Sequence, residues 1–383
     1  MRAVPKAMQR HAEQSRRVDE AGATPESPLE TRSSDELQGS ASAPATAATA
    51  VPVLAPLVSA TDLAKTFDVS APWLNRVIDR QPRQLLRAVD GVSFDIQRGQ
   101  TLALVGESGC GKSTVARLLV GLYEPTRGGF EFGGEDAHAA FKSSRSKLMR
   151  RRIQMIFQDP FASLNPRWKV EDIVAEPLRE HGIESEPLAL RERVGSLLQS
   201  VGLTPEDGAK FPHQFSGGQR QRISIARALA TEPEFLVCDE PTSALDVSVQ
   251  AQVLNIMKTL QRERGLTYLF ISHNLAVVRH VSDHVGVMYL GRLVEVAPKH
   301  SLFDSPRHPY TRMLLDAIPK LHDTGKARTP VSGEVPNPLN PPLGCAFNPR
   351  CEHANERCRN ERPVLKTVGG IRVACHGVEE GRI

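Results

Sequence analysis

A glycine-rich run constrains the fold of this chain more than any other feature. Residues 106–114 read GESGCGKST, with the apolar stretch TLALV before them and the helix-like stretch STVARLLVGL overlapping and following them. Strand, glycine-rich turn and helix in this order predict a phosphate-binding loop, because backbone N–H groups at a helix start can cradle phosphate oxygens. The alternative, a glycine-rich turn with a chance Lys-Ser pair, does not account for the flanking elements.

Particular side chains of this run have expected roles. We expect Lys112 to reach the β and γ phosphates and the Ser113 hydroxyl to bind Mg²⁺. The expected nucleotide-binding residues of the loop are Gly106, Glu107, Ser108, Gly109, Cys110, Gly111, Lys112, Ser113 and Thr114.

A pair of acids follows a second apolar stretch, FLVCDE. Asp239 and Glu240 are therefore expected at the carboxyl end of a buried strand, beside the phosphate loop. Asp239 suits a Mg²⁺ ligand, and Glu240 suits a residue that polarises the attacking water. Without the phosphate loop, two solvated acids at a strand end would be the better interpretation.

A second anion site is predicted at residues 216–219, which read SGGQ before the helical stretch ISIARALA. Ser216 suits the N-cap of that helix, and Gly217, Gly218 and Gln219 complete its first turn. One phosphate loop leaves this site without an internal use, so we expect it to close over the nucleotide of another subunit.

The remaining pattern predicts an α/β fold with a parallel sheet. IQMIFQ, FLVCDE and TYLFISH are candidate buried strands separated by helical stretches, whereas LVSATDLAKTF and AVDGVSFDIQ alternate as antiparallel strands do. We predict a disordered extension at 1–56, a main domain at 57–304 with a helical subdomain at about 160–230, and a separate tail at 305–383.

Composition excludes some classes of protein. No run of eighteen apolar residues exists, and the N-terminus lacks the apolar core of a secretory signal, so we expect a cytosolic chain that reaches a membrane only through a partner. The net charge of +4 is mild, and the basic run at 145–152 has no interleaved aromatic residues. A solvated face is expected there, not a nucleic-acid site.

The order of these motifs resembles the nucleotide-binding domain of ABC transporters over residues 57–300. Gly106–Thr114 resembles the Walker A loop, Asp239-Glu240 Walker B, and Ser216–Gln219 the LSGGQ signature with Phe215 in place of leucine. The resemblance implies that Gln158 is the Q-loop glutamine and a Mg²⁺ ligand, His273 the switch histidine, Phe67 the aromatic that stacks on adenine, and 243–246 the D-loop. Asn274 stands where the family has Asp.

The family's fold and chemistry follow as expectations. The resemblance implies an ABC-type P-loop ATPase core, an antiparallel β subdomain and a helical subdomain, followed here by a small Cys-containing appendage. Glu240, His273 and Gln158 are the expected catalytic residues, with ATP and Mg²⁺ as cofactors. A second ATPase subunit, identical or different, is the expected partner.

Further motifs resemble the ATPases of oligopeptide/dipeptide importers. These are QDPFASLNPR after Gln158, HPYT at 308–311, and GCAFNPRC with a later VACH. The resemblance implies two permease subunits, an extracytoplasmic substrate-binding protein and a place at the cytoplasmic face of the plasma membrane. The ATPases of glutathione and nickel importers share these motifs, so glutathione and nickel remain alternatives to peptides as the transported solute. A soluble ABC-fold protein or a non-catalytic half of a heterodimer fits less well.

Four cysteines in the tail predict a metal site. Cys345, Cys351, Cys358 and Cys375 are separated by six, seven and seventeen positions in a proline-rich segment. A small segment without its own core gains stability from a metal crosslink, and four thiolates suit a [4Fe–4S] cluster or Zn²⁺. The resembled family carries an iron–sulfur cluster here in some members. Free thiols are the remaining alternative, and His353 or His376 could replace a zinc ligand.

Overall fold

The computed structural model describes residues 55–72, 75–76, 82–317 and 333–383. The predicted N-terminal extension lies almost entirely outside these residues. Within the described part of the chain, no helix is long and apolar enough to cross a bilayer.

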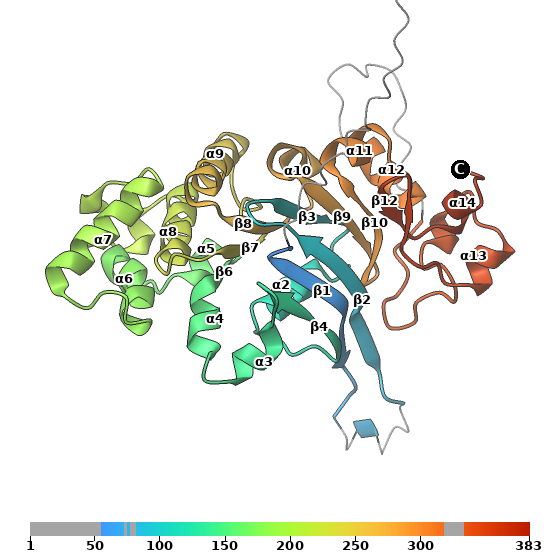
Figure 1. Ribbon diagram of the computed structural model, residues 1–383, viewed down its shortest axis with the longest axis horizontal. Helices are drawn as coiled ribbons and strands as arrows, with labels where there is room; N and C mark the ends of the chain where they lie inside the picture. The colour runs from blue at the N-terminus through green and yellow to red at the C-terminus, as the bar shows by residue number, and fades with distance from the viewer. Residues whose placement is uncertain (1–54, 73–74, 77–81, 318–332) are drawn as a thin grey trace, which may run out of the picture. The chain divides into compact units, whose positions relative to one another are not determined.

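The main sheet carries the parallel core that the apolar stretches predict. Its strand order is β11-β12-β10-β9-β3-β8-β7-β6, and β9, β3, β8, β7 and β6 run parallel to one another (Figure 1). The parallel strands are β3 (Thr101–Val105), β6 (Ile153–Ile156), β7 (Phe235–Asp239), β8 (Thr267–Ile271) and β9 (His284–Tyr289). Every residue of β3, β7 and β8 is buried, which explains why these strands are mostly apolar.

Helices α2 (Lys112–Leu119), α9 (Val247–Arg264) and α10 (Leu275–Val281) follow the carboxyl ends of β3, β7 and β8. Parallel strands joined by helices place all their carboxyl ends at one edge of the sheet. This topology gathers the residues after β3, β7 and β8 although they are far apart in the sequence.

A smaller antiparallel sheet has the order β2-β1-β4-β5. Its strands are β1 (Val58–Asp68), β2 (Leu85–Ile96), β4 (Arg127–Phe132) and β5 (Glu135–Asp136), followed by α3 (Ala137–Lys142) and α4 (Ser146–Arg152). The two alternating stretches predicted as antiparallel strands are β1 and β2, which pair with each other. Their buried side chains join the core around α2.

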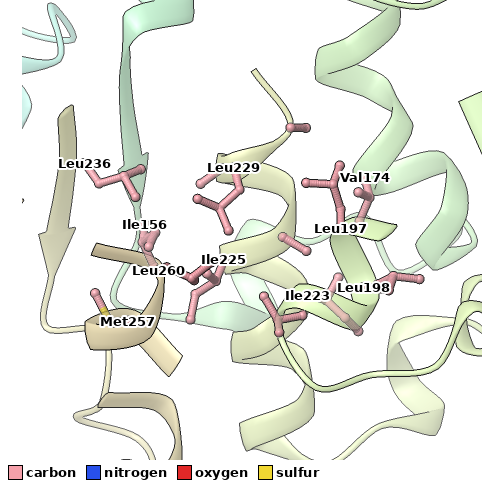
Figure 2. Close-up of a cluster of buried hydrophobic side chains, with 14 of the residues drawn as sticks. Ile156, Val174, Leu197, Leu198, Ile223, Ile225, Leu229, Leu236, Met257 and Leu260 are labelled. Atoms are coloured by element: carbon pink, nitrogen blue, oxygen red, sulfur yellow. The ribbon is translucent and has the colours of Figure 1, made fainter. Parts of the chain in front are cut away.

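A helical segment interrupts the main sheet between β6 and β7. It contains α5 (Pro160–Ser163), α6 (Val170–Glu180), α7 (Pro187–Ser200) and α8 (Gly217–Leu229). Figure 2 shows how α8 joins this segment to the sheet: Ile223 lies toward Leu197 and Leu198 of α7, and Ile225 lies near Ile156 of β6. The apolar stripe of α8 therefore connects the predicted signature to the strands of the nucleotide site.

Residues beyond β10 (Arg292–Pro298) contribute to the same sheet. They form α11 (Lys299–Asp304), α12 (Pro309–Asp316), α13 (Glu356–Asn360), β11 (Lys366–Val368), β12 (Ile371–Val373) and α14 (His376–Glu379). β12 pairs antiparallel with β10, so the last strands extend the main sheet at its edge. The described part of the predicted tail thus packs on the main domain through backbone hydrogen bonds as well as side chains.

Candidate functional site

The phosphate-binding loop leaves β3 and enters α2, as the sequence predicts. Gly111 has a φ of +107°, and a Cβ there would lie 2.2 Å from the carbonyl oxygen of Ala88. Only glycine fits that backbone conformation and that close approach. The Lys112 side chain is buried, and its ammonium donates hydrogen bonds to the carbonyl oxygens of Gly106 at 2.8 Å and Glu107 at 3.0 Å. The positive charge of Lys112 is thus held directly over the loop.

A hydroxyl and a carboxylate meet beside this loop. Ser113 Oγ donates to Oδ1 of Asp239 at 2.9 Å, although 126 residues separate them. Burial raises the pKa of Asp239, and the neighbouring Glu240 raises it further, against the opposing effect of the Ser113 hydrogen bond. An oxygen pair of this kind fits a hard divalent cation such as Mg²⁺, which would favour the ionised form of the carboxyl group.

Glu240 is held between two side chains from other strand ends. Its Oε2 accepts a hydrogen bond from Nε2 of Gln158 at 3.2 Å and lies 3.1 Å from Nδ1 of His273. Glu240 itself has a φ of +46°, unusual for a residue with a side chain, and its backbone N–H donates to the carbonyl of Ile271. Such a strained backbone fixes the carboxylate at the point where β7 and β8 end.

Asn274 shows why an amide fits beside His273. Its side-chain oxygen accepts from the backbone N–H groups of Ala276 at 3.0 Å and Val277 at 3.4 Å. Asn is as good an N-cap as Asp, so α10 begins in the same way with either residue.

The signature stretch begins α8. Ser216 Oγ accepts from the N–H of Gln219 at 3.3 Å, and the Gln219 side chain accepts from the N–H of Ser216 at 3.0 Å, which completes a capping box. Ser216 and Gln219 are exposed, while Phe215 is buried. Among the described residues, no hydrogen bond or ion pair connects this stretch to the phosphate loop.

Phe67 lies near the end of β1, half-buried. Its ring packs edge-on against Tyr123 with centroids 5.4 Å apart, and the Lys65 ammonium lies 5.3 Å from its centroid. An aromatic platform with a cation nearby is compatible with base stacking, and adenine binding by Phe67 stays a prediction.

Comparison with known sequences identifies the family. The profile described as "ABC transporter" matches residues 89–243, and the profile described as "Oligopeptide/dipeptide transporter, C-terminal region" matches residues 294–358. The Di/tripeptide transport ATP-binding protein DppF of Pseudomonas aeruginosa is 51% identical over 85% of this chain and 98% of its own length. The chain belongs to the ATP-binding proteins of the oligopeptide/dipeptide ABC transporter family.

Other relatives agree with this assignment. The Dipeptide transport ATP-binding protein DppF of Escherichia coli is 50% identical over 85% of this chain and 95% of its own length. The solved structure of the ATP-binding cassette MJ0796, a dimer bound to ADP and Pi, is 26% identical and covers 63% of this chain and 98% of its own, with a TM-score of 0.55. These relations confirm the predicted ABC ATPase fold and the predicted ATP hydrolase activity.

The metal prediction for the tail of this ABC ATPase is wrong. Cys345, Cys351, Cys358 and Cys375 line one small cavity, but no three His, Cys, Asp or Glu side chains in the described ranges are placed to hold a metal ion. Burial raises the pKa of Cys345 to about 11 and also raises the pKa values of Cys351 and Cys375. An iron–sulfur or zinc site therefore lacks support among the described residues.

Two contacts at the ATPase site were not predicted. Glu107 in the loop receives a hydrogen bond from Arg350, and its backbone N–H donates to the hydroxyl of Tyr310. Both partners lie in the motifs HPYT and NPRC, which the sequence analysis used only as family marks. The signal available in the sequence was an arginine in a motif to which no catalytic role had been assigned.

Proposed function

We propose that this chain is the ATP-hydrolysing subunit of an importer that takes up peptides through partner permeases. The observation that supports hydrolysis is the group formed by Glu240, Gln158 and His273, which lies beside the Ser113–Asp239 pair. Peptides are the proposed solute because the relatives are named as di/tripeptide and dipeptide transport proteins. The presence of Glu240 and His273 argues against the alternative that this chain is a non-catalytic, regulatory subunit of a heterodimer.

The chemistry of this site is positioning and charge stabilisation. Lys112 would supply a positive charge for the phosphates, and the glycines of 106–111 would let N–H groups face them. Ser113 and Asp239 would hold Mg²⁺, with Gln158 as the further predicted ligand; when bound with ATP, the metal neutralises phosphate charge. Glu240 would orient the attacking water, and His273 would contact the γ-phosphate.

A second subunit completes the site in this proposal. The exposed Ser216 and Gln219 lie at the start of α8, and among the described residues no hydrogen bond or ion pair links them to the chain's own phosphate loop. The N-terminus of α8 would bind the nucleotide of the opposite subunit, identical or different, and so sandwich ATP. The apolar stripe of α8 would transmit closure to strands β6 and β7, which carry Gln158 and Glu240 at their ends.

The permeases would dock on the segment that follows Gln158. Phe161 is 61% exposed and Trp168 41% exposed, and the Arg220 guanidinium lies 3.9 Å from the Phe161 ring centroid. Exposed aromatics with a neighbouring arginine are typical of protein interfaces. The chain would then lie peripherally at the cytoplasmic face of the membrane, with an extracytoplasmic binding protein selecting the solute.

Co-purification tests the assembly. A tagged full-length chain, expressed from its own host and solubilised in mild detergent, should retain two permease subunits and a second ATPase subunit. Phe161→Ala together with Trp168→Ala should lose the permeases. The control Leu188→Ala, at an exposed apolar residue on α7, should keep them. Retention of permeases by the double variant would contradict the docking site; no permease with the wild type would favour a soluble ABC protein.

A further inference from the structure

The C-terminal residues contact the phosphate-binding loop through a buried arginine. Arg350 Nη1 donates to Oε2 of Glu107 at 2.8 Å, and Nη2 donates to Oε1 at 3.0 Å. The Arg350 side chain is 1% exposed and that of Glu107 23%. Two parallel N–H···O bonds between a guanidinium and a carboxylate form the most directional ion pair that side chains make. The pair joins positions 243 residues apart.

Further contacts fix both partners of this pair. The Tyr310 hydroxyl accepts from the backbone N–H of Glu107 at 2.9 Å, and the Tyr289 hydroxyl accepts from Arg350 Nη1 at 3.4 Å. The two tyrosine rings are fully buried and pack with centroids 4.6 Å apart, and Phe347 packs against both. Arg350 therefore approaches the loop from a rigid aromatic cluster built by β9, α12 and the tail.

Glu107 is the point where this cluster meets the lysine of the nucleotide site. Its carboxylate binds Arg350, its N–H binds Tyr310, and its carbonyl oxygen accepts from Lys112 Nζ at 3.0 Å. All three groups of one loop residue are thus engaged at once. A shift of Glu107 would move a direct hydrogen-bond partner of Lys112.

We infer that Arg350 is a positioning residue for ATP binding. Arg350 fixes the loop at Glu107 and neutralises the Glu107 carboxylate next to the phosphate site. The inference rests on the nucleotide site proposed above. Arg350 does not touch the reacting atoms; it acts through Glu107. Without the Arg350 guanidinium, the partly buried Glu107 carboxylate would lack its ion-pair partner. Its negative charge would then repel the triphosphate of ATP and weaken ATP binding.

A charge cycle tests this role in the full-length chain. Arg350→Gln should raise the Kd for a fluorescent ATP analogue about tenfold, as expected when a charged hydrogen bond is lost and its acceptor stays behind. In a Glu107→Gln background, position 107 carries no negative charge for Arg350 to neutralise. The same Arg350→Gln change should then raise the Kd by less than about twofold. The effect should appear mainly in KM for ATP, with a smaller change in kcat.

The matched control is Arg357→Gln in the same tail. Arg357 pairs with Glu361 and Glu380 and is only partly buried, so its loss should leave the Kd for the ATP analogue unchanged. Tm is measured for every variant. If Arg350→Gln does not fold, Tyr310→Phe keeps the buried ring, removes only the hydroxyl that holds Glu107, and should raise the Kd severalfold.

Two results would overturn the inference. One is a Kd for the ATP analogue equal to the wild-type value in folded Arg350→Gln, or in Tyr310→Phe if Arg350→Gln does not fold. The other is an equal loss of affinity in the Glu107→Gln background, which would mean that Arg350 acts on the general packing of the tail. Failure of the wild-type chain to bind the analogue at all would instead contradict the nucleotide site, so the two failures are distinguishable.

Discussion

Glu240→Gln should lower steady-state ATP hydrolysis about 10²- to 10⁴-fold, the range expected when a group that activates water loses its charge. Glutamine keeps the shape of the side chain, so the contacts to Gln158 at 3.2 Å and His273 at 3.1 Å can persist with an amide. Nucleotide binding should be retained, because Lys112 and the loop are untouched. Phosphate release in the assembled transporter measures the loss, and a stable ATP-bound dimer in size-exclusion chromatography shows that closure is intact.

The control for this prediction is Glu263→Gln near the end of α9. Glu263 is exposed and lies on the helix that follows Walker B, so the same chemical change should leave hydrolysis at the wild-type rate. Turnover of Glu240→Gln close to that of Glu263→Gln would refute the assignment of Glu240.

Lys112→Ala should weaken ATP binding about 10- to 100-fold, since a charge-assisted contact to phosphate is removed from a buried position. Ser216→Arg should spare binding to the isolated subunit and block hydrolysis in the dimer, because its target nucleotide belongs to the opposite chain. Equilibrium titration with a fluorescent ATP analogue measures the first effect, and phosphate release by the dimer measures the second.

Ser216→Ala separates the cross-subunit block from loss of the helix cap. Alanine removes the Ser216 hydroxyl that caps α8, at a cost of about 1 kcal/mol in stability, but adds no bulk. It should therefore keep more hydrolysis than arginine does. Equal loss of ATP binding in monomeric Lys112→Ala and Ser216→Arg would contradict the sandwich arrangement.

The sequence was informative about the nucleotide site because its parts follow buried strands. Gly106 follows β3, Glu240 follows β7, and His273 lies two residues beyond β8, so parallel pairing brings them to one edge of the sheet. Each strand is short and mostly apolar, a pattern that is visible without knowing its neighbours. Strand order and topology were enough to predict that Glu240 lies beside the loop, whereas His273 was predicted only from the resemblance to ABC transporters.

The tail was less predictable because its structure depends on distant partners. β12 has only three residues and gains its place by pairing with β10, and Arg350 finds Glu107 across 243 positions. Neither contact leaves a local periodicity. The cysteine count gave the number of possible ligands but not the placement of their sulfur atoms, and for that reason the metal prediction failed.

Uptake of a labelled dipeptide into liposomes tests the central claim most directly. The chain is reconstituted with its co-purified permeases and second ATPase, the substrate-binding protein is added on its own side, and ATP is supplied on the side of the ATPase subunits. We predict dipeptide accumulation that requires ATP, is lost with Glu240→Gln, and exceeds any uptake of glutathione or nickel. ATP-driven accumulation of glutathione or nickel without dipeptide would contradict the peptide assignment, and hydrolysis without uptake of any of the three would contradict the account of this chain as a peptide importer ATPase.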